Sequence, residues 1–295
     1  MVGRLTDRRA GWSAFPRRRT FAGVPTDVSA TGVAVVTGAA RGIGAGIAGA
    51  AARAGMTVLV ADRDGEAAAA RAEKLNEAGG RAIAVATDVT DFDAVERLAE
   101  IAFGQDAPVR LVAGNAGIEH VGLLWEGSPS SWHDLLAVNL HGVYHGVRAF
   151  VPRLLAQGEP ASLLHTSSIA AFTTGAQQGA YQVSKRAVLA LSECLASELA
   201  AVGAPITVTV AFPGPVDTQI FALPAPDAPE SVAALSMLQR LVGKRGADPD
   251  EAGRLLFDAA VAGRPWVTTD LAGLREFVAP ARATLDDVAA HAIGP

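Results

Sequence analysis

The sequence predicts an α/β fold, a doubly wound parallel sheet of about seven strands in a single domain with helices on both faces. From Val33 onward, short apolar runs alternate with longer Ala- and Leu-rich segments, which is the pattern of consecutive βαβ units. Most of the short runs are apolar on both faces, as expected of buried parallel strands. No internal repeat or change of composition divides the 295 residues, so one domain accounts for the pattern.

The individual elements follow from hydrophobic periodicity and from residues that start helices. The expected strands are Val33–Thr37, Thr57–Ala61, Arg81–Ala86, Val109–Ala113, Ser162–Thr166, Ile206–Ala211 and Trp266–Thr269. The expected helices are Ile43–Ala54, Glu66–Ala78, Asp91–Phe103, Trp132–Leu155, Ala180–Ala201 and Asp250–Ala262. Asp91 and Pro249 stand where helices begin.

Charge is distributed unevenly along the chain. The first 30 residues hold six arginines against two aspartates, a local charge of +4, so the rest carries −9 within the total of −5. An acidic body argues against nucleic acid as a partner. The run Arg17–Arg19 is similar to a twin-arginine export signal, but no apolar stretch follows before Thr31, which favours a basic, disordered arm.

A cytoplasmic protein with no membrane partner is expected. Its single cysteine, Cys194, cannot form an internal disulfide, which suggests a reducing compartment, although an exported protein can also lack disulfides. No apolar run approaches the roughly 18 residues that a membrane-spanning helix needs.

A glycine-rich turn, Thr37–Gly44, lies directly between an expected strand and an expected helix. Gly38 permits a tight turn, Gly42 lets backbone N–H groups approach a pyrophosphate, and Gly44 allows close packing of helix on strand. The helix that follows directs its positive end at the phosphates. The turn predicts dinucleotide binding, with a purely structural turn as the alternative, and it lacks the Gly-Lys-Ser/Thr of a P-loop.

An acidic residue at the end of the second expected strand favours NAD over NADP. Asp62 can accept hydrogen bonds from both ribose hydroxyls and repel a 2′-phosphate. The alternative for Asp62 is a helix cap, since Asp62 and Asp64 both precede a helix. Arg41 and Arg63 argue the other way, because a guanidinium pairs well with a 2′-phosphate.

Tyr181 and Lys185 are four residues apart on an expected helix, which places both side chains on one face. Acid/base work by tyrosine near neutral pH needs its pKa lowered by about 3 units from about 10, and a nearby cation can supply much of that. The alternative is a Tyr/Lys pair on a solvated helix face.

The chain resembles the short-chain dehydrogenase/reductase family, of the kind with about 250 residues and a Rossmann-like sheet. The resemblance covers about Thr31 to Thr269 and rests on an ordered set of motifs. The set comprises Thr37–Gly44, Asp88-Val89, Asn115-Ala116-Gly117, Asn139, Ser167-Ser168, Tyr181xxxLys185 and Pro213-Gly214-Pro215-Val216-Asp217-Thr218.

The resemblance implies a catalytic tetrad of Asn139, Ser168, Tyr181 and Lys185. Ser168 is preferred to Ser167 because an interval of thirteen residues to the tyrosine is usual in the family. Tyr181 is then the general acid/base, Ser168 holds the substrate oxygen, Lys185 lowers the pKa of the tyrosine and binds the nicotinamide ribose, and Asn139 supports a water between Lys185 and solvent. The alternative for Asn139 is an amide in the middle of a helix without a catalytic role, and the alternative for Ser168 is an ordinary hydroxyl at a strand end.

The resemblance also implies the coenzyme contacts. They are Gly38, Arg41, Gly42, Ile43, Gly44, Asp62, Arg63, Asp88, Val89, Asn115, Gly117, Tyr181, Lys185, Pro213, Gly214, Val216 and Thr218. Asp88 is expected beside the adenine, Asn115 and Gly117 along the adenosine, and Val216 with Thr218 at the carboxamide. The chain departs from the family at Gly114, where asparagine is usual, and at Phe212, which is expected to narrow the nicotinamide pocket.

Other chemistries find little support in the sequence. His141 and His145 have the spacing of a zinc-binding helix, but Gly142 stands where the HExxH motif needs its glutamate. No GxSxG motif occurs, so a nucleophile-elbow hydrolase is not expected.

The resulting prediction is a dinucleotide-binding catalytic domain over residues 31–272, between the arm at 1–30 and a C-terminal tail or helix at 273–295. Residues 217–246, where three prolines precede an amphipathic run, are expected to form an irregular loop with a short helix that covers the substrate, here called the flap. Candidate substrate contacts are His120, Trp125, Gln177 and Gln178.

The expected activity is hydride transfer between NAD(H) and a fairly apolar secondary alcohol or ketone. One alternative is an NADP(H)-dependent carbonyl or 3-oxoacyl reductase. Another is a non-catalytic dinucleotide-binding sensor or assembly partner. The family resemblance implies a homodimer or homotetramer assembled through the helices at Trp132–Leu155 and Ala180–Ala201.

Overall fold

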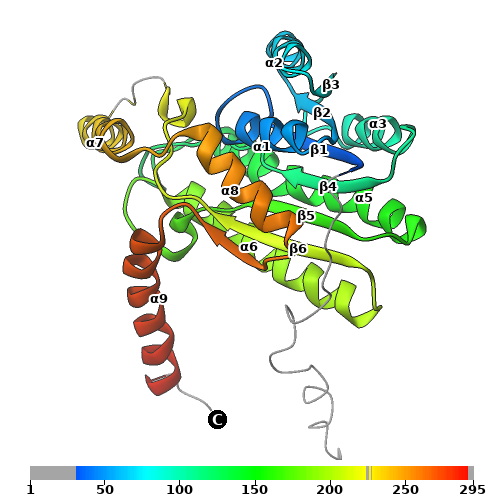
Figure 1. Cartoon of the computed structure of the whole chain (residues 1–295). Coiled ribbons are helices and arrows are strands. Elements are labelled where there is room, and N and C mark those ends of the chain that lie inside the picture. Colours follow the sequence, from blue (N-terminus) through cyan, green and yellow to red (C-terminus); the bar gives the residue numbers. More distant parts are fainter. Residues whose placement is uncertain (1–30, 224–225, 227, 292–295) are drawn as a thin grey trace, which may run out of the picture.

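The structure, a computed structural model, describes residues 31–223, 226 and 228–291. The expected arm (1–30) and the end of the expected tail (292–295) lie outside the described residues. Within them the chain forms one seven-stranded parallel sheet in the order β3-β2-β1-β4-β5-β6-β7 (Figure 1). The predicted fold class is confirmed.

Every expected strand is present within one residue of its expected bounds. The strands are β1 (Val33–Thr37), β2 (Thr57–Asp62), β3 (Arg81–Ala86), β4 (Val109–Gly114), β5 (Ala161–Thr166), β6 (Ile206–Phe212) and β7 (Trp266–Thr268). The α-helices are α1 (Gly42–Arg53), α2 (Gly65–Glu77), α3 (Phe92–Phe103), α4 (Pro129–Leu136), α5 (Gly142–Gln157), α6 (Gly179–Ala201), α7 (Pro229–Arg245), α8 (Pro249–Val261) and α9 (Leu271–His291). The shorter helical elements are η1 (Ala137–His141), η2 (Ile169–Phe172) and η3 (Gln219–Phe221).

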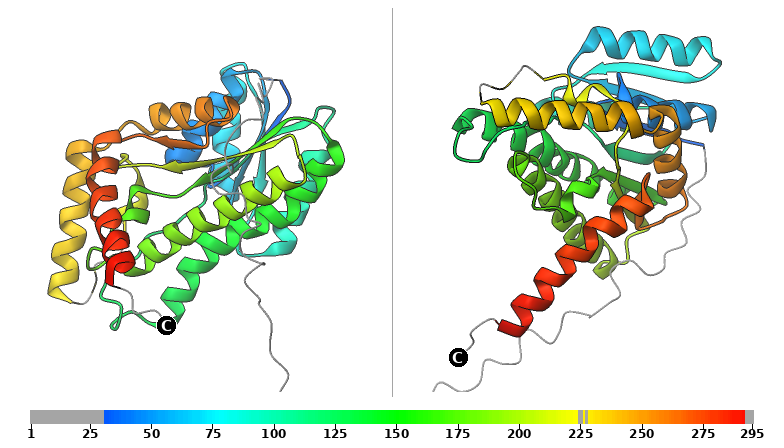
Figure 2. Two further views of the ribbon diagram at one scale, coloured as in Figure 1. Left: turned by 90° about the horizontal axis from the view of Figure 1, so that it is seen from below. Right: turned by 90° about the vertical axis from the view of Figure 1, so that its left-hand side faces the viewer.

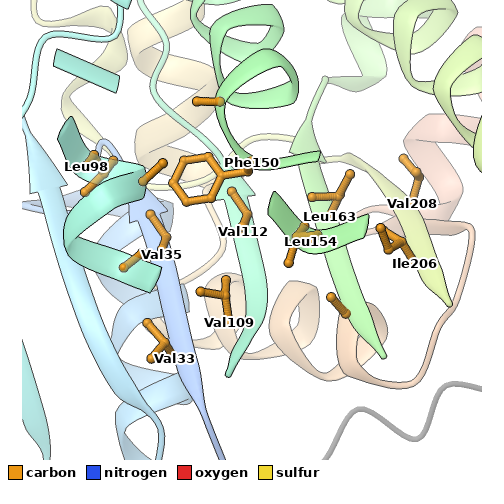
Figure 3. Packing of buried hydrophobic residues seen from close by; sticks show 14 of the residues in the cluster. Val33, Val35, Leu98, Val109, Val112, Phe150, Leu154, Leu163, Ile206 and Val208 are labelled. Atoms are coloured by element: carbon orange, nitrogen blue, oxygen red, sulfur yellow. The ribbon is translucent and has the colours of Figure 1, made fainter. Parts of the chain in front are cut away.

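Alternate residues of the central strands pack against opposite layers of helices. Val33 and Val35 of β1 lie in a buried cluster with residues of α3, α5 and α6, such as Phe150 (Figure 3). Ala34 and Val36 lie in a second cluster with α1, α2 and α8. Burial on both faces explains why the central strands are continuous apolar runs. The two edge strands are exceptions, since Ile83 of β3 is 38% exposed and Trp266 of β7 is 42% exposed.

Helices α1 and α8 approach so closely that two glycines are required between them. A Cβ on Gly46 of α1 would lie 2.2 Å from the carbonyl oxygen of Pro249. A Cβ on Gly253 of α8 would lie 2.3 Å from the backbone carbon of Gly46. This contact fixes the start of α1, which carries the glycine-rich turn, against the sheet.

The expected helix at Trp132–Leu155 is instead two α-helices joined by a π-helical turn. α4 begins early, at Pro129, because Ser128 caps it and proline suits the first turn. The π turn η1 contains Asn139, whose amide is bonded to the segment that follows β4. A wider turn of this kind often marks a functional site.

The flap segment contains a longer helix than expected. After η3, α7 runs for 17 residues, with Pro229 in its first turn and Lys244 and Arg245 in its last, where cations complement the helix dipole. Near the C-terminus, α9 leaves the β7 edge and runs past the sheet (Figure 2). None of the helices among the described residues is both long and apolar enough to cross a membrane.

Candidate active site

The site lies where the order of strands reverses. β1 is flanked by β2 and β4, so the connections that leave β1 and β4 diverge to opposite faces and open a crevice at the carboxyl ends of these strands. The glycine-rich turn after β1 and the segment after β4 border this crevice. The Tyr/Lys helix α6 and the end of β5 approach it from the side of the later strands.

The glycine-rich turn has the backbone that its sequence predicts. Gly38 (φ 62°) and Gly42 (φ 58°) adopt the left-handed region that favours glycine. Gly44 has no space for a side chain, because a Cβ would lie 2.1 Å from the carbonyl oxygen of Gly38 and 2.6 Å from Nδ2 of Asn115. The turn is therefore a narrow backbone cradle.

The start of α1 suits an anion. The side chains of Asp64, Asp91, Ser128 and Asp248 cap α2, α3, α4 and α8. α1, like α5, α6 and α7, has no side-chain cap among the described residues, and its first turn holds no acidic residue. Uncapped N–H groups beside three glycines are the donor set that a pyrophosphate needs, so these residues fit a dinucleotide. Ile43 packs beneath the turn against the core.

Asp62 holds the glycine-rich turn and is not the cap of α2. Its carboxyl oxygens accept hydrogen bonds from the backbone N–H of Ala40 and of Asp64, both at 3.1 Å. Asp64 is the cap of α2, since it accepts from the backbone N–H of Ala67. Asp64 also forms an ion pair with Arg41 at 2.6 Å, whereas Arg63 is exposed.

The next two candidate contacts lie after β3. Asp88 is exposed, and its hydrogen bonds from the backbone N–H and hydroxyl of Thr90 lower the pKa of its carboxyl. Val89 is buried, and its carbonyl oxygen lies 2.8 Å from Nδ1 of His145. His145 and His141 are the two histidines with the spacing of a zinc-binding helix. The His145 imidazole is engaged in this contact, and His141 is exposed. Among the described residues, no group of three or more His, Cys, Asp or Glu side chains is placed to hold a metal.

The side chain of Asn115 forms hydrogen bonds to neighbouring strand ends. Its Nδ2 donates to the carbonyl oxygen of Thr37 at 3.1 Å, and its Oδ1 accepts from the Thr166 hydroxyl at 3.2 Å. It therefore ties together the ends of β1, β4 and β5. Gly114 simply continues β4, so the departure from asparagine does not disturb the strand.

The segment after β6 meets the glycine-rich turn. A Cβ on Gly42 would lie 3.1 Å from Cγ2 of Thr218, so these two residues are neighbours. Gly214 and Val216 are held by Thr269 and Ala247. The backbone carbonyl oxygen of Pro213 accepts a bond from Ile169 in η2.

Phe212, the large residue at the end of β6, lies in an apolar cluster. Its ring lies 5.1 Å from that of Phe172 and 5.9 Å from that of Trp266, in an apolar cluster against Leu274 and Phe277 of α9. Packing of α9 on the end of β6 explains this large residue.

The three expected polar groups of the reaction converge at the ends of β5 and α6. The Ser168 side chain lies close enough to the Tyr181 hydroxyl to lower the pKa of that group. Nζ of Lys185 lies 5.5 Å from the centre of the Tyr181 ring and donates to the carbonyl oxygen of Thr166 at 3.0 Å. Ser167 is used elsewhere, because its hydroxyl donates to the carbonyl oxygen of Lys185.

Asn139 is buried and fully engaged. Its Oδ1 accepts from the backbone N–H of Ile118 at 2.8 Å, and its Nδ2 donates to the carbonyl oxygen of Ile118 and to Oγ of Ser184. Gly117 passes close by, since a Cβ there would lie 3.4 Å from both Oδ1 of Asn139 and Nζ of Lys185. The amide of Asn139 is thus engaged at both its oxygen and its nitrogen.

The pKa of Tyr181 differs in direction from the sequence-based expectation. Burial and the nearby Glu119 carboxyl raise the pKa of its hydroxyl, and the Ser168 side chain opposes them. Burial also lowers the pKa of Lys185 to about 8, so the amine carries its charge less readily than an exposed lysine. Desolvation of both partners is the reason that proximity alone does not make the phenol acidic.

Glu119 is a residue that the sequence interpretation missed. It is 5% exposed, and burial raises the pKa of its carboxyl to about 8. The available signal was an acidic residue soon after the end of a central strand, where ligands bind in such sheets.

The four candidate substrate contacts separate into two groups. Gln178 donates from Nε2 to Glu119 at 3.1 Å, and Gln177 accepts from the Ser231 hydroxyl of α7 at 2.7 Å, so both face inward. His120 is half-buried beside Gly122, whereas Trp125 is 80% exposed and is not gathered into the site.

A dinucleotide cradle at the switch point, together with a Ser/Tyr/Lys group at the neighbouring strand ends, defines a nicotinamide-dependent oxidoreductase. Comparison with known proteins agrees. Residues 32–227 match the family described as short chain dehydrogenase, and the chain belongs to this family.

Relatives and solved structures show the same family. The chain is 45% identical over 190 residues to a 1-deoxy-11-beta-hydroxypentalenate dehydrogenase of Streptomyces exfoliatus, covering 64% of this chain and 68% of that protein. A short chain dehydrogenase/reductase of Burkholderia phymatum in complex with NAD superposes with a TM-score of 0.82, 31% identity, and coverage of 92% and 99% of the two chains. An alcohol dehydrogenase of Thermococcus sibiricus complexed with 5-hydroxy-NADP has a TM-score of 0.67, 27% identity, and coverage of 81% and 95%.

The chain is thus an oxidoreductase that acts on CH–OH groups with a nicotinamide dinucleotide.

Proposed function

We propose that the protein interconverts a secondary alcohol and a ketone with NAD(H), and that Tyr181 is the general acid/base. The observation that carries this proposal is the surroundings of the Tyr181 hydroxyl: the Ser168 side chain lies close enough to lower its pKa, and the Lys185 amine lies 5.5 Å from the centre of the tyrosine ring. A substrate oxygen that contacts both hydroxyls at once is then held where a proton must move.

In ketone reduction, Tyr181 gives its proton to the carbonyl oxygen, and in alcohol oxidation it takes the hydroxyl proton. Ser168 donates a hydrogen bond to the same oxygen and stabilises the charge that develops there. The coenzyme supplies or accepts the hydride. Lys185, held by Thr166, stabilises the tyrosinate and binds the ribose, and Asn139 fixes the Ile118 backbone beside it.

NAD is the proposed coenzyme because of the charge at the end of β2. The Asp62 carboxylate lies against the glycine-rich turn, where it accepts ribose hydroxyls and repels a 2′-phosphate. Asp64 pairs with Arg41, which competes with any role of this guanidinium as a phosphate ligand. Exposed Arg63 is the feature that favours the alternative, an NADP(H)-dependent carbonyl or 3-oxoacyl reductase.

The coenzyme proposal is tested by comparing kcat/KM for the two coenzymes. The unmodified protein is expected to prefer NAD, and Asp62→Ala to reduce that preference at least about tenfold, which corresponds to about 1.4 kcal/mol. Asp64→Asn is a second variant: it releases Arg41 from its ion pair and leaves Asp62 in place, so it is expected to shift the preference toward NADP by a smaller factor than Asp62→Ala. Better use of NADPH by the unmodified protein rejects the proposal.

The first substrate to test is the hydroxy acid named in the Streptomyces relatives, followed by other apolar secondary alcohols. We expect NADH formation with the wild-type protein and a loss of at least about 100-fold in kcat for Tyr181→Phe. Tight NAD binding with equal inactivity of both proteins on every alcohol and ketone favours the sensor or assembly role instead.

We propose a homodimer or homotetramer built through α4, α5 and α6. Apolar side chains on the outer faces of two of these helices support it, since Tyr144, Leu155 and Val183 are 42–48% exposed in the single chain. Sedimentation equilibrium tests this, and a monomer at micromolar concentration contradicts it.

A further inference from the structure

Glu119 is a buried carboxyl group that the proposed mechanism does not use. It lies in the segment between β4 and α4, beside the crevice. Its Oε1 accepts from the backbone N–H of His120 at 3.0 Å, and its Oε2 accepts from Nε2 of Gln178 at 3.1 Å. Gln178 directly precedes α6, so the carboxyl is joined to the start of the helix that carries Tyr181 and Lys185.

The ionisable neighbours of Glu119 are those of the reaction. From α6, its charge acts on the Tyr181 hydroxyl and on the Lys185 amine. From its own segment, His120 contributes its backbone N–H. These are the groups that influence the carboxyl among the described residues, apart from the amide of Gln178.

We propose that Glu119 is a further positioning residue of this site: its carboxyl, held by Gln178 at the start of α6, controls the charge around the Tyr181 hydroxyl and the Lys185 amine. The inference rests on the function proposed above. It adds a third ionisable group to the Tyr/Lys pair, and it gives Gln178 a role in holding that group.

The direction of the effect follows from Coulomb's law. An ionised Glu119 opposes formation of the tyrosinate and favours the ammonium, so it makes the Tyr181–Lys185 pair hold its protons to higher pH. A protonated Glu119 removes that opposition. Its pKa of about 8 places the change within the working range of a dehydrogenase.

The variant Glu119→Gln removes the charge and keeps the shape. Because the pair then loses its protons more readily, the acid limb of kcat/KM for alcohol oxidation is expected to move about one pH unit lower. Glu119→Asp retains the charge and is expected to keep the limb near its wild-type position. Glu193→Gln is the control, since Glu193 is an exposed glutamate on α6, the helix of Tyr181 and Lys185, twelve residues beyond Tyr181. An unmoved limb in Glu119→Gln, or an equal shift in Glu193→Gln, overturns the proposal.

A measurement without turnover separates this inference from the proposed function. The chain has two tyrosines, so Tyr144→Phe leaves Tyr181 as the single ¹³Cζ tyrosine signal in a labelled protein. In this background the signal is expected to show a titration step near pH 8, and Glu119→Gln is expected to change that step. Gln178→Ala removes the donor to Oε2 and is expected to move the step to higher pH, which provides a second variant if the first fails to fold.

If the Tyr181 signal titrates in the Glu119 and Gln178 variants as it does in the Tyr144→Phe background, the inference is overturned. This holds whether or not the protein shows enzyme activity. If the wild type is inactive on every alcohol while the step depends on Glu119, the proposed function fails and the charge coupling stands.

Discussion

Nδ2 of Asn139 donates a hydrogen bond to Oγ of Ser184 at 3.1 Å, and this bond joins the π turn to α6 one residue before Lys185. Both residues are fully buried. The Ser184 hydroxyl in turn donates to the carbonyl oxygen of Tyr181 at 2.7 Å. The Asn139 amide also forms hydrogen bonds with the backbone N–H and the backbone carbonyl of Ile118. One side chain therefore sets the spacing between α6 and the segment after β4.

Replacing Asn139 with alanine is therefore expected to lower both stability and activity. It leaves the N–H and carbonyl of Ile118 without their side-chain partner and removes the donor to the Ser184 hydroxyl oxygen, at a cost of about 2–4 kcal/mol in the free energy of unfolding. Asn76→Ala is the matched control. The Asn76 amide forms the same pair of hydrogen bonds with the backbone N–H and carbonyl of Ala82, but at an exposed position. Urea unfolding is expected to show a cost of about 1 kcal/mol for the control. An equal loss of unfolding free energy in Asn139→Ala and Asn76→Ala would mean that burial of the Asn139 hydrogen bonds has no effect.

The contact between α1 and α8 predicts opposite effects for the same substitution in two helices. Gly253→Ala places a methyl group 2.3 Å from the backbone of Gly46, so we expect a loss of at least about 2 kcal/mol and weaker NAD binding as α1 shifts. Gly243→Ala in α7 meets no described atom within 4 Å and is expected to stabilise by up to about 1 kcal/mol through helix propensity. Thermal unfolding of both variants measures this, and a neutral Gly253→Ala contradicts the packing.

His165 on β5 predicts a loss of stability in acid. It is buried beside Ser192, and burial lowers its pKa from 6.5 to about 4. The imidazole is thus protonated more readily in the unfolded chain than in the folded chain. Its contribution to stability is present above pH 6.5 and is lost as the pH falls toward 4.

His165→Asn removes the titration. Relative to the variant, the wild type is expected to lose about 2 kcal/mol more between pH 7 and pH 5. The exposed His133→Asn serves as control and is expected to follow the wild type. Parallel stability curves for wild type and His165→Asn would contradict a neutral buried imidazole.

The sheet was predictable because its signals are local. Continuous apolar runs and the glycines at 38, 42 and 44 require little knowledge of the rest of the fold, and these strands appear within one residue of their expected bounds. The positions of Ser168, Tyr181 and Lys185 followed from spacing within the family resemblance, and the structure brings all three together.

Other features depend on contacts between distant residues. The partner of Glu119 lies 59 residues along the chain, and the burial of its carboxyl is not visible in the neighbouring sequence. Asn139 in the π turn and Asn115 after β4 likewise form hydrogen bonds to residues that follow or end other strands, namely Ile118 and Thr166. The lowered pKa expected of Tyr181 failed for a related reason, since burial depends on tertiary packing.

Gln177 links the flap to the segment between β4 and α4. This residue has a φ of 73°, which is unusual for a side chain other than glycine, asparagine or aspartate. Its backbone carbonyl accepts from the N–H of Gly122, and its Oε1 accepts from the Ser231 hydroxyl of α7 at 2.7 Å. Two bonds thus hold a strained residue between α7 and the segment that carries Glu119.

Ser231→Ala breaks the bond to α7 alone. If the flap covers the substrate, we expect KM for the alcohol to rise about three- to tenfold, which corresponds to about 1 kcal/mol, while the dissociation constant of NAD stays unchanged. Ser236→Ala, on the same helix, is the control and is expected to alter neither quantity. Steady-state kinetics with coenzyme titration separates the outcomes, because a role of α7 in NAD binding would instead move the dissociation constant, and a purely structural bond would lower the melting temperature with KM intact.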